Sequence, residues 1–375
     1  MPRPLFEVTD LRVAVFDTDH AAQGVLGPIT DTGEELDPGW VEVVPALSFS
    51  VEPGEVLAIV GESASGKSLA LMGGFALLSP GTRVIGGGTR YKDVTFRPGG
   101  DVDVSDSRGS RKRRREARLA GTVVADDGNE AWARAMGREI GFIFQNPVGS
   151  WSPDQVIGTQ SGEALSVHSD LTDDEIEERV LDALGEVNLP RSRRMLGAFR
   201  HELSRGMAQR AMLAAALTKT PSLLIADEPL NGLDAPVAAA IMDLIKDMQD
   251  KRDMAMIIVT HDLASVAGIA DRVAVLYGGE IVEDAPVVDL YHHPKHPYTS
   301  GLIGSIPGVS DGRLRPIEGE APRLVDVART ACSFADRCPL ATDVCRSTHP
   351  VLRVVSGSFV ACHHAGSKGL PGIVG

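Results

Sequence analysis

The most informative part of the sequence is the octet Gly61-Glu62-Ser63-Ala64-Ser65-Gly66-Lys67-Ser68, which fits the pattern G-x-x-x-x-G-K-[ST]. It follows an apolar run, Val56 to Val60, and precedes a helix-like run, Leu69 to Leu78. The order strand, glycine-rich turn, helix points backbone N–H groups at a phosphate chain, with Lys67 at the β and γ phosphates and the Ser68 hydroxyl on Mg²⁺. The stretch therefore predicts a loop that binds a nucleoside triphosphate. A merely structural Gly-Ser turn is the alternative.

A second element carries two adjacent acids. Ser222-Leu223-Leu224-Ile225-Ala226-Asp227-Glu228 is an apolar strand that ends in carboxylates, which is a Walker B pattern. In phosphate-loop enzymes the first acid steadies Mg²⁺, and a second acid beside it can deprotonate the attacking water. We expect Asp227 to take part in Mg²⁺ binding and Glu228 to be the general base. The alternative, a buried strand that stops at a solvated acidic turn, leaves Lys67 without a metal partner.

Length and composition favour a large soluble enzyme subunit. The chain has 375 residues, 43% of them hydrophobic, and a formal net charge of −14. No uninterrupted apolar stretch approaches the ~20 residues of a membrane-spanning helix. The N-terminal residues also lack the pattern of a secretory signal, so the cytoplasm is the expected compartment. The negative charge argues against broad nucleic-acid binding, and we expect no nucleic-acid partner.

Four further motifs occur in order along the chain. A strand-like run ends at Gln145 in GFIFQNP (141–147), and LSRGMAQR (203–210) opens a helix rich in alanine and leucine. Gly232-Leu233-Asp234 follows the Walker B strand, and IIVTHD (257–262) is a strand that ends in a histidine. With the two elements above, these motifs resemble the Q-loop, signature, D-loop and H-switch of an ABC-type ATPase. The resemblance spans roughly residues 5–290, and six motifs in order are far more specific than any one of them.

The resemblance implies catalytic roles for two more side chains. Gln145 would sense Mg²⁺ and the attacking water, and would move with a segment that touches a membrane partner. His261 would contact the γ-phosphate and hold the water and Glu228 in line. ATP and Mg²⁺ are therefore the expected substrate and cofactor.

The signature departs from the family pattern at one residue. ABC ATPases are head-to-tail dimers, so Ser204 and the backbone around Gly206 would face the partner's γ-phosphate from a helix N-terminus, and Asp234 would also belong to the nucleotide site. Arg205 stands where glycine is usual. It does not freely adopt positive φ and would crowd the nucleotide, unless its charge pairs with phosphate. We hypothesise that the composite site using this signature is impaired and that the site using Glu228 is active, which favours a non-identical sister ATPase as partner.

The adenine base usually stacks on an aromatic residue upstream of the loop. Phe16 is the candidate, with Trp40 behind it. Phe16 is as readily explained as a core residue of a strand, because the stretch from Asp17 to Val44 is longer than the family normally carries.

Residues from about 146 to 215 predict a helical subdomain. Thr172-Asp173-Asp174-Glu175 has the S/T-x-x-E form of a capping box, and apolar residues follow at helical spacing. In ABC proteins this segment docks onto the transmembrane partner. Trp151 would lie near the docking groove or, alternatively, would anchor an ordinary loop. The segment from about 97 to 130, with the basic run Arg111 to Arg115, is expected to be a mobile surface loop.

The C-terminal part indicates a subfamily. The run HHPKHPYT (292–299) precedes Cys332, Cys338, Cys345 and Cys362, whereas the first 331 residues contain no cysteine. This part resembles the C-terminal extension of the oligopeptide, dipeptide and nickel ABC importer ATPases. Four clustered thiols in a reducing compartment favour metal ligation over disulfides. Some relatives carry a [4Fe-4S] cluster, so we expect that cluster, with zinc or unligated thiols as the alternatives.

The sequence thus predicts an α/β fold. Its P-loop NTPase core of the ABC type has a mostly parallel sheet, an antiparallel β portion and a helical subdomain, and spans residues 1–290; a small cysteine-containing extension spans 291–375. The resemblance implies an ATP-hydrolysing subunit, peripheral at the cytoplasmic face of the membrane, that energises uptake of di- or oligopeptides. Two permease subunits and an extracytoplasmic solute-binding protein are the further partners. A soluble ABC ATPase of DNA repair or translation is the alternative, and a non-ABC P-loop NTPase is a third.

Overall fold

The computed structural model describes residues 3–96, 127–307, 316–366 and 370. The basic run Arg111 to Arg115 lies outside the described residues, as does most of the segment that the sequence marks as a surface loop. The chain forms two compact units. Unit 1 comprises Met1–Leu5, Val51–Val56 and Ala125–Val259, and unit 2 comprises Phe6–Ser50, Leu57–Val124 and Thr260–Gly375.

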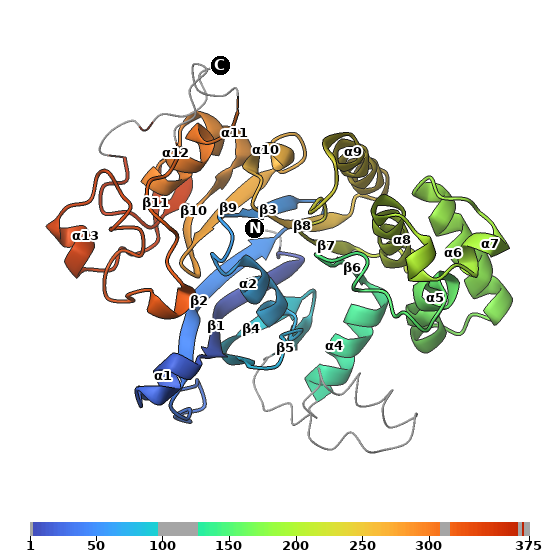
Figure 1. Ribbon diagram of the computed structural model, residues 1–375, viewed down its shortest axis with the longest axis horizontal. Helices are drawn as coiled ribbons and strands as arrows, with labels where there is room; N and C mark the ends of the chain where they lie inside the picture. Colours follow the sequence, from blue (N-terminus) through green and yellow to red (C-terminus); the bar gives the residue numbers. More distant parts are fainter. Residues whose placement is uncertain (1–2, 97–126, 308–315, 367–369, 371–375) are drawn as a thin grey trace. The chain divides into compact units, whose positions relative to one another are not determined.

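Unit 2 contains an antiparallel sheet with the strand order β2, β1, β4, β5 (Figure 1). Its strands are β1 (Phe6–Phe16), β2 (Trp40–Val51), β4 (Thr82–Tyr91) and β5 (Val94–Phe96). The short helix α1 (Thr18–Ala22) follows β1 and precedes β2 along the chain. The helix α2 (Lys67–Gly74) packs against β1 and β4. The antiparallel β portion expected near the N-terminus is therefore present.

Unit 2 also contains a mixed set of strands in the order β11, β12, β10, β9, β3. The strand β3 (Val56–Val60) is apolar and wholly buried, and it pairs in parallel with β9 (Arg272–Tyr277). The remaining strands, β10 (Glu280–Pro286), β12 (Ser358–Val360) and β11 (Arg353–Val355), are antiparallel to their neighbours. The helices that follow β8 in this unit are α10 (Leu263–Val266), α11 (Val287–His292), α12 (Pro297–Gly304), η3 (Leu324–Asp326) and α13 (Asp343–Ser347).

Unit 1 is built on three parallel strands in the order β6, β7, β8. They are β6 (Ile140–Ile143), β7 (Leu223–Asp227) and β8 (Ala255–Thr260). All residues of β7 and β8 are buried, as expected of strands covered on both faces. Because the strands are parallel, their carboxyl ends meet at one edge, where Ile143 pairs with Ala226 and Asp227 pairs with Val259.

Unit 1 also contains helices, of which α5, α6, α7 and α8 lie together (Figure 1). The helices are α4 (Asp127–Arg138), α5 (Ile157–His168), α6 (Asp173–Glu186), α7 (Arg193–Leu196), η2 (Arg200–Glu202), α8 (Arg205–Leu217) and α9 (Ala235–Arg252). The predicted capping box is confirmed: the Glu175 N–H donates to Thr172 Oγ1 at 3.4 Å, and the Thr172 N–H donates to Glu175 Oε2 at 2.7 Å. This reciprocal pair satisfies two donors that helix formation would leave open at the start of α6.

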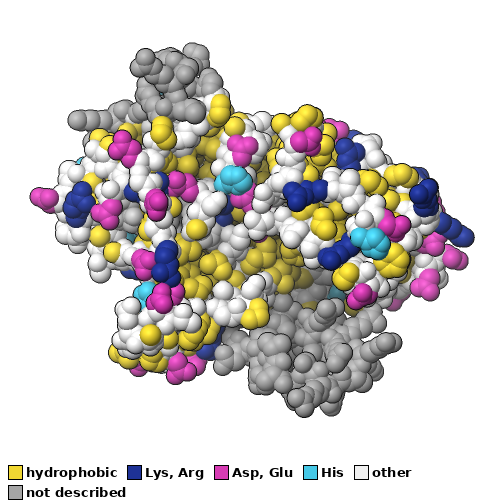
Figure 2. Space-filling view, in the orientation of Figure 1, with side chains coloured by type: hydrophobic (Ala, Val, Ile, Leu, Met, Phe, Trp, Pro, Cys, Tyr) yellow, Lys and Arg dark blue, Asp and Glu magenta, His cyan; other side chains and the backbone are white. Residues whose placement is uncertain are grey.

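The α/β architecture is confirmed by these elements. Within the described residues, no helix is both long and apolar enough to cross a bilayer. The predicted domain boundary at residue 290 stays a prediction, since residues on both sides of it belong to unit 2. On the face drawn in Figure 2, acidic and basic side chains of the described residues are interspersed.

Candidate nucleotide site

The loop Gly61–Ser68 joins β3 to α2, which confirms the expected order of strand, loop and helix. Gly66 is the N-cap of α2 and has a φ of 97°. A Cβ on Gly61 would lie 2.2 Å from the carbonyl oxygen of Leu276. Only glycine fits either position, because the first needs a left-handed backbone and the second leaves no space for a side chain.

The polar groups of this loop are arranged to receive a phosphate chain. The Lys67 side chain is buried, and its Nζ donates to the carbonyl oxygens of Gly61 at 2.8 Å and Glu62 at 2.9 Å. The Ser65 hydroxyl is buried as well, and it has no hydrogen-bond partner in the described part of the chain. An unpaired buried hydroxyl is costly, and a phosphate oxygen is an acceptor that would satisfy it. The loop therefore fits the triphosphate that the sequence predicts.

Three predicted residues share the carboxyl edge of the strands in unit 1. Asp227 ends β7, and Glu228 follows it with a φ of 47° and with its N–H donating to the Val259 carbonyl at 2.8 Å. Both acids are buried. A non-glycine residue held in the left-handed region costs of order 1–3 kcal/mol, and such residues cluster at functional sites. Gln145 is exposed and lies two residues beyond β6, the parallel neighbour of β7, so it belongs to the same edge.

The signature residues open helix α8 in unit 1. Ser204 is the N-cap, and its Oγ accepts from the Met207 N–H at 3.2 Å. Arg205 is the first helical residue and has no positive φ, so the backbone strain that the sequence raises for an arginine here does not arise. Its Nη1 instead donates to the Gly232 carbonyl at 2.7 Å, in the turn that leads to Asp234, the N-cap of α9.

Two further predicted residues lie in unit 2. His261 is exposed and directly follows β8. Phe16, at the end of β1, is 46% exposed, so the alternative that it is a core residue is wrong. Its ring meets the ring of Trp40 edge-on, with centroids 5.8 Å apart. An exposed ring can stack on a base, and adenine stacking on Phe16 stays a prediction.

Trp151 is an anchored loop residue. It is only 5% exposed, and its Nε1 donates to the Ala208 carbonyl at 3.3 Å. The burial of Trp151 therefore favours the interpretation as an anchored loop residue over direct contact with a membrane partner.

The four cysteines are all free thiols in unit 2. The Cys332 N–H donates to the Cys345 carbonyl at 2.9 Å. Burial raises the pKa of Cys332 to about 11, and the charges of Cys345, Cys362 and Cys338 act in the same direction. Within the described residues, however, no group of three or more His, Cys, Asp or Glu side chains is placed to hold a metal ion. The expected iron–sulfur centre is thus not supported as a preformed set of ligands.

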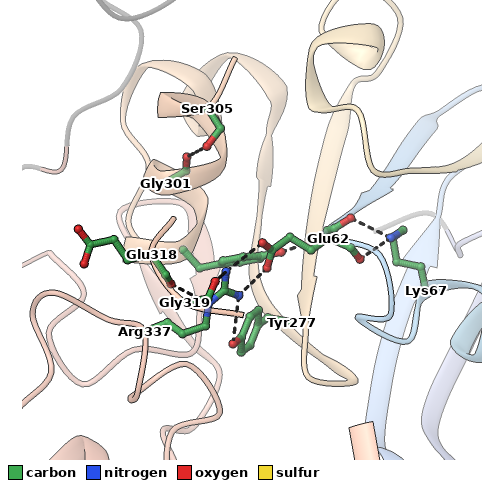
Figure 3. Close-up of polar contacts among 10 residues, drawn as sticks. Glu62, Lys67, Tyr277, Gly301, Ser305, Glu318, Gly319 and Arg337 are labelled. Carbon is green, nitrogen blue, oxygen red and sulfur yellow. Dashed lines mark hydrogen bonds and ion pairs between the residues drawn. The ribbon is translucent and has the colours of Figure 1, made fainter. Parts of the chain in front are cut away.

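One set of contacts on the phosphate-binding loop is not predictable from the sequence. The carboxylate of Glu62 is bound by Arg337, from the C-terminal part of unit 2 (Figure 3). The N–H of Glu62 donates to Tyr298 Oη, from the same part of the unit. The HPYT run was the only local signal, and it pointed to a family rather than to this contact.

Comparisons with known proteins agree with this site. The family model described as ABC transporter matches residues 44–231, and the one described as Oligopeptide/dipeptide transporter, C-terminal region, matches residues 282–345. The dipeptide transport ATP-binding protein DppD of Haemophilus influenzae is 35% identical over 324 residues, which cover 86% of this chain and 89% of that protein. The oligopeptide transport ATP-binding protein OppD of Mycobacterium tuberculosis is 38% identical over 364 residues, which cover 96% of this chain and 52% of that protein.

Solved structures show the same fold. The ATP-binding cassette MJ0796, solved as a dimer in a post-hydrolysis state with ADP and Pi, matches with a TM-score of 0.53 at 20% identity, covering 75% of this chain and 98% of that one. The fold and the phosphate-binding loop define a P-loop ATPase of the ABC type. The chain belongs to the ABC transporter family, and its C-terminal region is that of the oligopeptide and dipeptide transporters.

Proposed function

We propose that this chain binds and hydrolyses ATP to drive the uptake of di- or oligopeptides across the cytoplasmic membrane. One observation carries the proposal: a built phosphate-binding loop, Gly61–Ser68, and an oligopeptide-transporter C-terminal region occur in the same chain. The names of the relatives, which are peptide transport ATP-binding proteins over most of this chain's length, support it.

The loop residues would hold the triphosphate. Lys67 would neutralise the β and γ phosphates, and the N–H groups at the start of α2 would donate to phosphate oxygens. Ser68 and Asp227 would bind Mg²⁺, with Gln145 as a further contact. The metal ion supplies charge neutralisation at the transferred phosphoryl group. Phe16 would stack on the adenine.

Hydrolysis would then depend on side chains at the strand ends. Glu228 would accept the proton of the attacking water, and His261 would contact the γ-phosphate and hold the water in line. Positioning and electrostatics dominate phosphoryl transfer, since little covalent chemistry falls to the protein.

A second ABC ATPase subunit would complete the site. Ser204, Gly206 and Asp234 would face the nucleotide of that partner, as in the head-to-tail dimers of the family. The exposure of Ser204 and Arg205 at the start of α8 supports this, because a helix N-terminus favours a bound anion. We propose a non-identical sister chain, a pair of permease subunits and an extracytoplasmic solute-binding protein as the other components, with this chain peripheral at the cytoplasmic face.

Purification of the tagged chain from its native membrane in mild detergent tests the function. We expect two integral-membrane permease subunits and a second ATPase to be recovered with it, and the bound solute-binding protein to name the solute class. Recovery of an active ATPase with no membrane partner would overturn the proposal in favour of a soluble ABC ATPase.

We also propose that the cysteines bind a metal, on the chemistry of the donors. Cys332, Cys338, Cys345 and Cys362 supply four thiols, the donor set of a [4Fe-4S] cluster or a structural zinc. As arranged they do not form a ligand group, so the proposed hydrolysis uses no metal at these thiols. Iron, acid-labile sulfide and zinc assays on anaerobically purified protein test the proposal. Iron together with sulfide would support the cluster, and zinc alone would overturn the preference for it. If neither metal is found, the thiols are unligated and the proposal of a metal site is overturned.

A further inference from the structure

Glu62 of the phosphate-binding loop is contacted by Arg337, from the C-terminal part of unit 2 (Figure 3). The N–H of Glu62 donates to Tyr298 Oη at 2.8 Å, and its carbonyl oxygen accepts from Lys67 Nζ at 2.9 Å. Its carboxylate receives both arms of Arg337, with Nη1 to Oε2 at 2.6 Å and Nη2 to Oε1 at 3.0 Å. Glu62 therefore links the phosphate-binding lysine to a guanidinium 275 positions further along the chain.

Arg337 is engaged through every nitrogen of its guanidinium. Beyond Glu62, its Nε donates to the Glu318 carbonyl at 3.0 Å and its Nη2 to the Gly319 carbonyl at 3.2 Å. The side chain is 6% exposed, and that of Glu62 is 29% exposed. The hydrogen bond to Glu62 raises the pKa of Arg337, so the guanidinium is charged at any physiological pH. Exposed ion pairs contribute little, whereas a two-pronged and largely buried pair fixes the relative position of its partners.

An aromatic cluster holds the guanidinium in place. The rings of Tyr277, Tyr298 and Phe334 pack with centroids 4.6 to 5.3 Å apart, and all three side chains are buried. Arg337 Cζ lies 5.8 Å from the Tyr277 ring centroid, and Nη1 is 3.4 Å from Tyr277 Oη. Packed aromatic rings leave few alternative rotamers, so both groups that bind Glu62 come from a rigid support.

The HPYT run (296–299) positions Tyr298, one of the two tyrosines of this cluster. Buried Glu283 accepts from the Lys295 N–H and from the His296 N–H, each at 2.8 Å. His296 Nδ1 accepts from the Tyr298 N–H at 3.1 Å. Burial lowers the pKa of His296 to about 3, so the ring is neutral and can act as that acceptor. The run therefore orients Tyr298 toward the loop.

A second arginine, Arg329, binds the turn that contacts the same loop. Arg329 Nη1 donates to the Gly278 carbonyl at 2.6 Å, and Nη2 donates to the Val43 carbonyl at 2.9 Å. The neighbouring Gly279 N–H donates to the Ser65 carbonyl at 2.9 Å. The turn that Arg329 binds therefore contacts the loop at Ser65, in addition to the contacts at Glu62.

We propose that Arg337 is a positioning residue for ATP binding, which acts through Glu62. By fixing Glu62 it keeps the two carbonyl oxygens that hold Lys67 in place before nucleotide arrives. A loop ordered in advance loses less conformational freedom on binding, so affinity rises. Arg337 does not touch the nucleotide, and its loss weakens ATP binding more than it slows the chemical step. The inference rests on the proposed binding of ATP by this loop.

A double-mutant cycle on the assembled complex tests this role. The variants are Arg337→Gln, Glu62→Gln and the two combined, with Arg337→Lys as the conservative replacement. Mg-ATP affinity by isothermal titration calorimetry and the KM and kcat of ATP hydrolysis are the readouts. We expect each single variant to raise Kd and KM about tenfold with kcat nearly unchanged, and the double variant to be no worse, because contacting residues are coupled. Arg337→Lys should restore part of the affinity.

Arg346→Gln is the matched control. It removes another arginine ion pair of the same region, Arg346 Nη1 to Asp336 Oδ1 at 3.1 Å, whose side chains are both exposed. We expect this variant to bind ATP as the wild type does. Folded Arg337 and Glu62 variants with wild-type Kd and KM, or additive effects in the double variant, would overturn the proposal. Failure of the wild type to bind ATP, or unchanged binding by Lys67→Ala, would instead contradict the proposed function.

Discussion

Two residues of the candidate nucleotide site are in energetically unfavourable states: one has a strained backbone and the other has a buried hydroxyl that makes no hydrogen bond within the described ranges. Glu228 is buried, and its backbone has the left-handed conformation. The hydrogen bond from its N–H to the Val259 carbonyl holds it in this conformation. Ser65 keeps a buried hydroxyl without a partner among the described residues. Such costs persist where the surrounding structure determines them and where a ligand or a reaction uses the result. Both residues belong to the motifs for ATP binding and hydrolysis.

Arg205 gives a prediction at this scale. Arg205→Gly removes the bond to the Gly232 carbonyl and should lower the free energy of unfolding by about 1 kcal/mol. If the arginine impairs the composite site, ATP turnover of the assembled complex should rise about tenfold, since a freed backbone donor at a developing charge contributes that much or more. Arg210→Gln in the same helix is the control and should leave turnover unchanged. An unchanged rate in Arg205→Gly would contradict the hypothesis.

His349 gives a prediction about pH. Its Nε2 lies 2.9 and 3.0 Å from the carboxylate oxygens of Glu280, and this hydrogen bond raises the pKa of His349, against the opposing effects of burial and Arg329. A raised folded-state pKa stabilises the protein fully below the unfolded value of 6.5, and the stabilisation is lost as pH rises through the folded-state value. The contribution should be below about 1 kcal/mol because the ring is partly exposed.

Thermal unfolding between about pH 6 and about pH 8 measures this effect. The difference in melting temperature between the wild type and His349→Gln should shrink as pH rises over that range, because the contribution of His349 is lost, while the opposite contribution of buried His296, whose pKa is lowered, is the same in both proteins. His201→Gln, in unit 1, is the control. A profile that keeps its slope in His349→Gln would show that another group is responsible.

At the scale of elements, local signals and buried faces decide which segments form. The capping box of Thr172 and Glu175 starts α6, whose Val180 and Leu184 are buried. The strands β7 and β8 are apolar throughout and are buried throughout. The buried strand β7 therefore places the carboxylates at its end, whereas the signature helix α8 begins at a cap that Ser204 itself supplies.

Trp151 gives the prediction at this scale. Trp151→Phe removes the bond from Nε1 to the Ala208 carbonyl and should lower the free energy of unfolding by about 1 kcal/mol. Trp151→Ala should cost about 3 kcal/mol or more, since it also empties a buried site. Urea denaturation measures both values. A cost well under 1 kcal/mol for Trp151→Ala would indicate an exposed contact residue instead.

The sequence predicted what local pattern and chemistry determine. The strand, loop and helix around Lys67 follow from glycine spacing and apolar runs, and the capping box follows from four consecutive residues. The sequence raises the question of backbone strain at Arg205, and this strain does not arise, because Arg205 begins α8 directly after the N-cap Ser204. The contact of Arg337 with Glu62 joins residues 275 positions apart, and tertiary packing alone brings them together.

For the whole molecule, the C-terminal region is part of the nucleotide-binding unit. It supplies Arg337, Arg329 and Tyr298, which bind the loop or the turn beside it. In the proposed transport cycle, hydrolysis changes the contact between two ATPase subunits, and the permeases convert that change into passage of the peptide. We propose that Glu228 is the general base of this cycle.

The role of Glu228 is tested by peptide uptake. The assembled complex is reconstituted in proteoliposomes with ATP on the side of this chain, and uptake of a radiolabelled peptide is measured. Glu228→Gln keeps the size of the side chain and removes the base, so uptake should fall about 10²-fold or more relative to the wild type, while Mg-ATP still binds. Uptake by Glu228→Gln at the wild-type rate would contradict the account.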